Sequence, residues 1–317
     1  MTRSTRRTFA AGSAVLALGL TLAACSTDSG DSTEDGADET TEETTDAEAG
    51  AANEDEMEVH IGIPSGWDEG IAVSHLWKSM LEDEGYTVET TTADIGVLFT
   101  GLAGGDFDLM FDGWLPLTHA SYWEEYGDDL TDLGVWYDNA KLTIAVNEDS
   151  PAQSLADLAE MADEYDNRLV GIEPGAGLTA TTQDAVIPTY GLEGMEYVTS
   201  STPAMLAELD SRTSAGENVV VTLWRPHWAY DAYPIRDLED PEGTLGEAEE
   251  IHTFGSGDIA ETHPTLVSWI ESFTLADDQL FEIENMMFNS DEFGEDYDAA
   301  AAAWLEANPD FAEGLKG

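Results

Sequence analysis

The stretch EVHIGIPSGWDEGIAVSHLWKSMLEDEG, residues 58–85, contains both patterns from which the fold class is inferred. Apolar residues alternate with polar or small residues from 59 to 63, which is the two-residue period of a strand with one buried face. They then recur at intervals of three and four residues from 71 to 81, and Gly85 ends that pattern. The stretch therefore predicts a strand followed by an amphipathic helix.

Strand-like and helix-like stretches continue to alternate along the chain. After the opening pair we expect strands around residue 88 and at 109–111, and between them a helix at 95–103. Later strands are expected at 142–147, 169–172, 196–199, 219–224 and 249–255, and helices at 155–162, 178–190, 203–212, 264–273, 276–288 and 295–307. Such alternation is typical of an α/β domain with a largely parallel sheet.

The strands and helices fall into two series, and each series predicts a lobe of its own. Residues 57–140 together with 235–317 are expected to form the first lobe, and residues 141–234 the second. The segments at 138–146 and 228–240 would cross between the lobes. The C-terminal helices would then return to the first lobe.

The N-terminal 24 residues have the layout of a secretory signal peptide. Three arginines precede an apolar run of about 16 residues, short of the roughly 20 that span a bilayer. The sequence LAAC then ends at Cys25 and resembles the lipobox of bacterial lipoproteins, so we expect cleavage before Cys25 and lipidation of its thiol. The arginine pair also resembles a twin-arginine signal, which leaves both the Sec and the twin-arginine export routes open.

The segment that follows Cys25 predicts a tether. Residues 26–56 consist largely of Asp, Glu, Thr, Ser, Gly and Ala, without an aromatic residue. This composition cannot bury a core, and its like charges repel one another, so we expect an extended, disordered acidic linker. The tether would hold the folded part away from a membrane.

Charge and motif content exclude several classes of function. The chain has 67 acidic residues against 10 Lys and Arg, which argues against nucleic acid as a partner. It has no GxSxG, HExxH or GxxxxGK[ST] motif, and its six histidines lack the close spacing of metal ligands. We therefore expect no catalytic residues, no metal and no cofactor.

Tryptophan is the informative residue type, since the chain has nine. Trp67 in IPSGWDEG, Trp114 in FDGWLPLTH and Trp224 in TLWRPHW each lie at the C-terminal end of an expected strand, beside glycine or proline. Ligand sites of α/β folds form at such strand ends. Taken singly, each of these residues would more often pack in a core than bind a ligand.

Four segments together resemble recurrent stretches of the glycine betaine binding proteins of ABC osmolyte importers. They are GWLPLTH at 113–119, GIEPGAGLT at 171–179, TLWRPHW at 222–228 and EEIHTFG at 249–255. The resemblance extends from about residue 57 to 317, and some members of the family permute the order of these segments. It implies a two-lobe, periplasmic-binding-protein-like fold of type II, with the ligand cleft between the lobes.

The resemblance also implies how the cationic end of the ligand is bound. Trp67, Trp114 and Trp224 would form three walls of an aromatic box around a quaternary ammonium group. The chemistry is consistent, because a trimethylammonium group has no N–H to donate, whereas indole faces attract its spread charge.

The other end of the ligand would be a carboxylate. The resemblance assigns its binding to the backbone N–H groups of Gly177 and Leu178, at the start of an expected helix, and to the His119 side chain. Glycine betaine is then the expected ligand, and the expected partner is an ABC permease in the membrane. The lipidated protein would work at the outer face of the cytoplasmic membrane.

Two alternatives stay open at this point. A related module for choline or carnitine would use the same aromatic box. A secreted carbohydrate-active enzyme would need a carboxylate pair beside the tryptophans, for which Asp68 and Asp112 are candidates. Arg225 departs from the family pattern, and we expect it to form a salt bridge with a nearby carboxylate.

Overall fold

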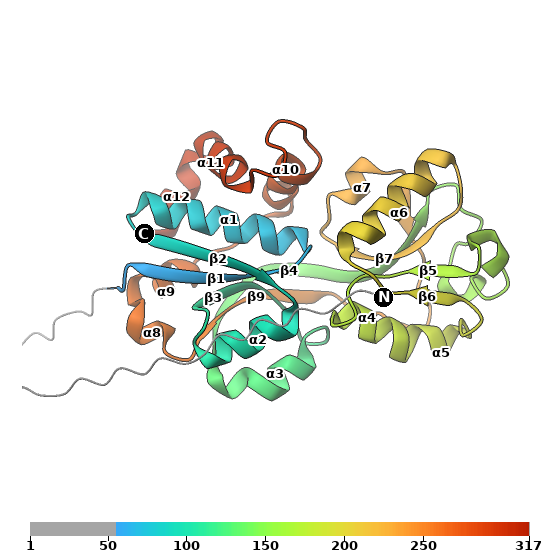
Figure 1. The fold of residues 1–317 in the computed structure, drawn as a ribbon, viewed down its shortest axis with the longest axis horizontal. Helices are drawn as coiled ribbons and strands as arrows, with labels where there is room; N and C mark the ends of the chain where they lie inside the picture. The colour runs from blue at the N-terminus through green and yellow to red at the C-terminus, as the bar shows by residue number, and fades with distance from the viewer. Residues whose placement is uncertain (1–54, 317) are drawn as a thin grey trace, which may run out of the picture. The chain divides into compact units, whose positions relative to one another are not determined.

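The computed structural model describes residues 55–316, which contain one nine-stranded sheet (Figure 1). The strands are β1 (Glu58–Pro64), β2 (Thr87–Ala93), β3 (Leu109–Leu115), β4 (Leu130–Asn147), β5 (Arg168–Val170), β6 (Glu196–Val198), β7 (Val220–Arg225), β8 (Ile235–Asp237) and β9 (Glu249–Ser256). Their order in the sheet is β2-β1-β3-β9-β4-β7-β5-β6, and β8 pairs with β4.

The sheet is mixed, so the prediction of a largely parallel sheet was wrong for its middle. β1 pairs in parallel with β2 and β3, and β5 pairs in parallel with β6 and β7. Between these two triplets, β9 and β4 run antiparallel to each other and to their outer neighbours. Local alternation of strands and helices predicts the two triplets, but it says nothing about how the long strands between them pair.

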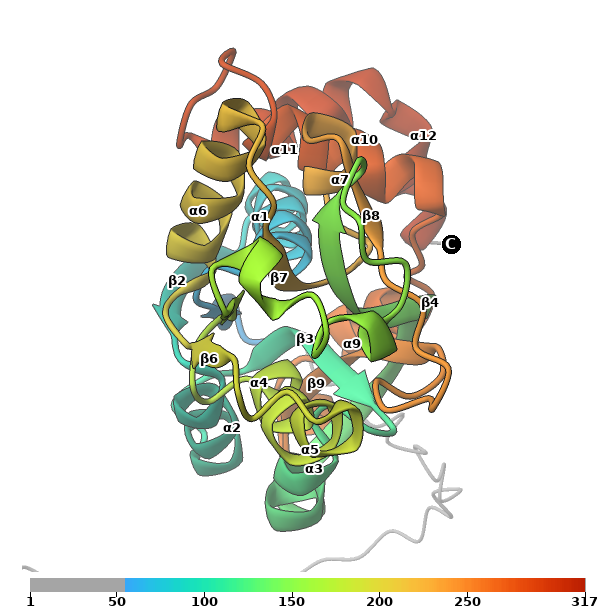
Figure 2. The same cartoon turned by 90° about the vertical axis from the view of Figure 1, so that its right-hand side faces the viewer.

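The helices cover both faces of the sheet (Figures 1 and 2). They are α1 (Asp68–Asp83), α2 (Ile95–Gly104), α3 (Ala120–Tyr126), α4 (Gly177–Thr181), α5 (Ile187–Tyr190), α6 (Thr202–Ala215), α7 (Ala229–Ala232), α8 (Ile259–Thr262), α9 (Pro264–Ile270), α10 (Asp277–Phe288), α11 (Tyr297–Ala307) and α12 (Pro309–Leu315). Both views place α1, α6, α7, α10 and α11 on one side of the sheet and α2, α3, α4 and α5 on the other.

One expected helix is absent. Instead of a helix at 155–162, the chain forms one short 3-10 turn at Leu155–Asp157, and a second one at Ala162–Tyr165 follows. The Tyr165 hydroxyl bonds the Ser150 side chain and accepts a bond from the Ala152 N–H at 3.2 Å. These tertiary contacts tie the segment to the preceding loop, and such contacts routinely override helix propensity.

The strand β4 connects the two ends of the sheet. It pairs with β9 as far as Ala140 and with β7 from Lys141 onward. We call β1, β2, β3 and β9 with α1–α3 and α8–α12 the β1 half, and β5–β8 with α4–α7 the β7 half. The sequence predicted only the second part of β4, because Gly134 with its positive φ and several register shifts interrupt the pattern of the first part.

The predictions for the N-terminal segment concern residues outside the described range. The expected signal peptide, Cys25 and all of the expected tether before residue 55 lie beyond them. Within residues 55–316, no helix is both long enough and apolar enough to cross a membrane.

Candidate ligand-binding site

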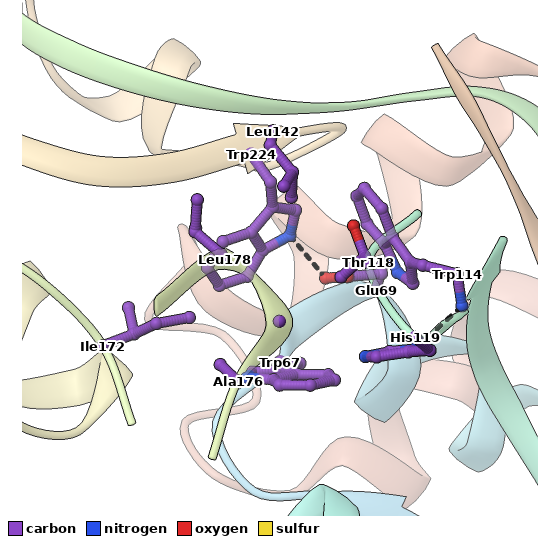
Figure 3. A pocket seen from close by; sticks show the side chains of 11 residues that line it. Trp67, Glu69, Trp114, Thr118, His119, Leu142, Ile172, Ala176, Leu178 and Trp224 are labelled. Carbon is purple, nitrogen blue, oxygen red and sulfur yellow. Dashed lines mark hydrogen bonds between the residues drawn. The ribbon is translucent and has the colours of Figure 1, made fainter. Parts of the chain in front are cut away.

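A pocket with about 290 Å³ of unfilled space lies where the two halves meet (Figure 3). The six residues that the sequence predicted to bind a ligand all line it: Trp67, Trp114, His119, Gly177, Leu178 and Trp224. The lining consists mainly of aromatic and aliphatic side chains with a few polar groups, which is typical of small-molecule sites.

The three tryptophans come from three different strand ends. Trp67 follows β1 and is the N-cap residue of α1, Trp114 lies in β3, and Trp224 lies in β7. Their exposed fractions are only 7%, 3% and 3%, so their indoles are held firmly by the surrounding protein. Figure 3 shows the three rings on different sides of one space.

Each of these indoles donates its N–H to a carboxylate. The bonds run from Trp224 to Glu69 (2.8 Å), from Trp114 to Asp112 (2.7 Å) and from Trp67 to Glu173 (3.4 Å). The polar edges of the rings are therefore already engaged. What remains for a ligand is the π-faces, which attract cations.

The carboxyl groups that accept the indole N–H bonds of Trp114 and Trp224 have strongly raised pKa values. Burial raises the pKa of Asp112 to about 7. Burial, together with the negative charge of the neighbouring Asp112, raises the pKa of Glu69 well above its usual range. A protonated carboxyl group still accepts an indole N–H bond, so protonation preserves the support of the rings.

His119 is held in one tautomer by the backbone of the strand before it. Its Nδ1 accepts the Trp114 backbone N–H at 2.9 Å, so the single proton of a neutral imidazole must lie on Nε2. Burial lowers the pKa of His119 to about 3, which keeps the ring neutral near pH 7. Its buried Nε2 has no hydrogen-bond partner among residues 55–316. The ring stacks on Trp67, with centroids 5.5 Å apart, and thus presents an unused donor beside the aromatic walls.

Gly177 and Leu178 form the first turn of α4, where backbone N–H groups have no partner within the helix. Gly177 lies against the opposite wall of the pocket, so closely that a Cβ on it would lie 2.1 Å from the carbonyl oxygen of Thr118. Only glycine permits the two halves to meet at this point. The Tyr122 hydroxyl also bonds the Gly175 carbonyl oxygen across the same gap, at 3.2 Å.

Sequence reasoning missed the residue that shapes the loop before His119. The buried carboxylate of Glu249, in β9, accepts the backbone N–H groups of Leu117 and Thr118 at 2.7 and 2.8 Å, and the Thr118 hydroxyl donates to its other oxygen. Glu249 begins the EEIHTFG segment, and the resemblance of that segment to the family was a signal that this part of the chain contributes to the site. Its partners were not predictable from that segment.

Five residues that line the pocket were not predicted. They are Glu69, Thr118, Leu142, Ile172 and Ala176. Glu69 lies two residues after Trp67, within the first turn of α1. Nothing in the sequence distinguishes it from the other acidic residues of so acidic a chain.

The carboxylate pair considered for an enzyme does not line the pocket. Asp68 is bonded to the Trp228 indole and Asp112 to the Trp114 indole, and both carboxyl groups are buried. Arg225 forms the expected salt bridge, with Asp237 at 2.8 Å, and its guanidinium lies over the Tyr230 ring. Within the described part of the chain, no three His, Cys, Asp or Glu residues are grouped to hold a metal ion.

Comparison with known proteins identifies relatives over most of the described residues. The family model described as the substrate binding domain of ABC-type glycine betaine transport system matches residues 57–307. The glycine betaine/carnitine transport binding protein GbuC of Listeria monocytogenes (serotype 1/2a, strain 10403S) is 31% identical over 153 residues. These residues are 48% of this chain and 49% of GbuC, so the chain aligns with about half the length of this curated relative.

Two solved structures extend the comparison to the fold. Lactococcal OpuAC, in its closed-liganded conformation with glycine betaine, matches with a TM-score of 0.76 and 26% identity, over 83% of this chain and 100% of that one. An ABC-transporter choline binding protein in complex with choline matches with a TM-score of 0.73 and 26% identity, over 80% of this chain and 89% of that one. These matches confirm the predicted two-lobe, type II binding-protein fold.

Proposed function

We propose that this chain, which belongs to the family of substrate-binding domains of ABC-type glycine betaine transport systems, captures glycine betaine outside the cytoplasm and delivers it to a membrane permease. One observation carries the proposal. Three indole faces and the unpartnered Nε2–H of His119 line one small pocket. Such a pocket complements a short zwitterion with a cation at one end and a carboxylate at the other.

The aromatic walls account for only part of the affinity. A desolvated cation–π contact contributes about 2 kcal/mol, so three contribute about 6 kcal/mol. Micromolar binding requires about 8 kcal/mol. The carboxylate end must therefore supply the rest, through charge-assisted bonds from His119 and from the N–H groups of Gly177 and Leu178.

The two halves give the proposal a mechanism of capture. We assign residues 57–140 and the chain from β9 onward to one lobe, and residues 141–234 with β8 to the other. The boundary expected at residue 235 therefore moves past β8, because β8 pairs with β4 at Ala145–Asn147. The change of the β4 partner from β9 to β7 at Ala140 and Lys141 supports this division. A ligand that contacts both lobes favours the closed arrangement because it binds that arrangement more tightly than the open one.

Choline is the second candidate ligand. The structural match to the choline binding protein favours it, and so does the Glu69 carboxyl group in the pocket lining, which is a suitable acceptor for a hydroxyl group. A carbohydrate-active enzyme fits less well, since neither Asp68 nor Asp112 lines the pocket and each accepts an indole N–H. We therefore propose a binding role without catalysis.

Calorimetric titration with a matched ligand set tests the proposal. The set consists of glycine betaine, choline, carnitine and 3,3-dimethylbutanoate, which has the shape and carboxylate of glycine betaine but a neutral carbon in place of nitrogen. We expect glycine betaine to bind most tightly and the neutral analogue to bind at least about tenfold more weakly, because it lacks the cation–π term. Equal affinity for glycine betaine and the analogue would refute the aromatic box.

His119 is expected to set the preference for the carboxylate. Choline replaces the carboxylate with a hydroxyl and leaves converging donors poorly paired, so the parent protein should prefer glycine betaine by at least about tenfold. His119→Ala should weaken glycine betaine binding more than choline binding, since only the carboxylate loses a charge-assisted bond. Parallel titrations in one high-salt buffer measure both affinities. An unchanged ratio of the two affinities in the variant would contradict the role assigned to His119.

We also propose that Cys25 is lipidated after export and anchors the protein at the outer face of the cytoplasmic membrane. The sequence LAAC and the preceding apolar run support this assignment. Two or more acyl chains give stable anchoring. Cys25→Ala should therefore shift the protein from the membrane fraction to the medium, as followed by immunoblotting of both fractions. Retention of the variant at the membrane would refute lipidation as the anchor.

A further inference from the structure

The N-terminal end of α1 contacts the opposite half of the molecule through a second indole. Asp68, the first residue of α1, accepts the indole N–H of Trp228, which lies just after β7. The partners are 160 residues apart in the sequence and come from different halves. Figure 1 shows this end of α1 facing the β7 half.

This bond differs from the indole–carboxylate bonds of the pocket walls. Neither Asp68 nor Trp228 lines the pocket, whereas Glu69 and Trp224 do. Asp68 is nevertheless only 7% exposed, and its carboxyl group also lies 3.5 Å from the His227 Nε2 of the β7 half. When the halves separate, both partners must lose this contact. The bond therefore belongs to the closed arrangement alone.

The donor side of the bond is held rigidly. The Trp228 carbonyl oxygen accepts the Asp231 N–H at 2.9 Å, so the residue is built into the start of α7. Its ring also packs against Tyr233, with centroids 5.9 Å apart. A donor fixed in this way pairs with Asp68 only at one separation of the halves.

We propose that Asp68 is a positioning residue for ligand capture: through Trp228 it holds the two halves together after closure, without touching the ligand. We call the hydrogen bond between Asp68 and Trp228 the latch. This inference rests on the proposed function, since it concerns release of the ligand captured between the halves. A contact formed only after closure slows dissociation and leaves the encounter rate unchanged. Removing this contact is therefore expected to raise the dissociation rate constant.

Stopped-flow tryptophan fluorescence with glycine betaine tests the proposal on the full chain. Asp68→Ala should raise the dissociation rate constant about five- to thirtyfold and change the association rate constant by less than about twofold. Asp68→Asn keeps an oxygen acceptor for the indole and should restore most of the parent rate. Adding Trp228→Phe to Asp68→Ala should have little further effect, because each substitution removes the same bond.

Glu282→Ala is the matched control. Glu282 accepts the Trp304 indole N–H at 3.0 Å, but both residues lie in the β1 half. Its loss should leave both rate constants at the parent values. A slower association with an unchanged dissociation rate in Asp68→Ala, or an equal effect of Asp68→Ala and Glu282→Ala, would overturn the latch.

A second measurement tests the latch independently of which ligand the protein binds. Dyes on Asp83→Cys and Glu193→Cys, both exposed and in different halves, report the separation of the halves by single-molecule energy transfer. Cys25→Ser removes the single natural cysteine. Asp68→Ala should increase the open population even if the parent binds choline instead of glycine betaine, or neither. An unchanged open population would overturn the latch, whereas failure of the parent to bind glycine betaine would overturn only the proposed function.

Discussion

Replacing Trp224 with alanine is expected to weaken glycine betaine binding by roughly thirtyfold or more. The substitution removes one indole face, worth about 2 kcal/mol when desolvated. It also leaves the Glu69 carboxyl group without the indole N–H that it accepts at 2.8 Å. Trp224→Phe keeps a π-face without the N–H and should fall between the parent and the alanine variant. Trp67→Ala and Trp114→Ala should show losses of similar size.

The matched control is a tryptophan outside the pocket lining. Trp123 is half-buried in α3 and stacks on Phe254, with centroids 4.8 Å apart. Trp123→Ala should lower the melting temperature but leave the affinity for glycine betaine nearly unchanged. In the box variants, the preference for glycine betaine over 3,3-dimethylbutanoate should shrink as well. If calorimetry found the three box variants as tight as the parent, the aromatic box would be refuted.

Gly177→Ala is expected to reduce the affinity for glycine betaine by roughly ten- to a hundredfold. The added methyl group would lie 2.1 Å from the Thr118 carbonyl oxygen and 2.9 Å from its carbonyl carbon. Backbone atoms cannot turn away as a flexible side chain does, so the two halves cannot reach the separation seen here. Titration calorimetry measures the loss.

The unliganded variant should be as stable as the parent. Alanine is a better helix former than glycine by up to about 1 kcal/mol, and the open arrangement has no clash. Gly175→Ala is the matched control in the same turn, since the nearest atom to its new methyl group would be the Tyr122 hydroxyl oxygen at 4.0 Å. Gly175→Ala should bind glycine betaine nearly as tightly as the parent. Equal affinities of the two variants would show that contact at Gly177 does not limit closure.

The sequence by itself predicted the local elements and the candidate site. Strand and helix periods report whether successive side chains face a core, so β1, α1 and β7 were found within a few residues of their bounds. Trp67, Trp114 and Trp224 were found because each lies at a strand end beside glycine or proline and because the resemblance to the family assigns all three to its aromatic box. The fold then brings these three residues to one pocket with His119, Gly177 and Leu178.

Only the tertiary structure decided which distant residues became partners. The antiparallel pairing of β4 with β9 and the 155-residue separation of Glu69 from Trp224 leave no trace in local periodicity. Among 67 acidic residues, the few that bond indoles or shape the Thr118 loop look like all the others in the sequence. A periodic pattern reports the environment of one segment, whereas a hydrogen bond across the cleft depends on where two segments meet.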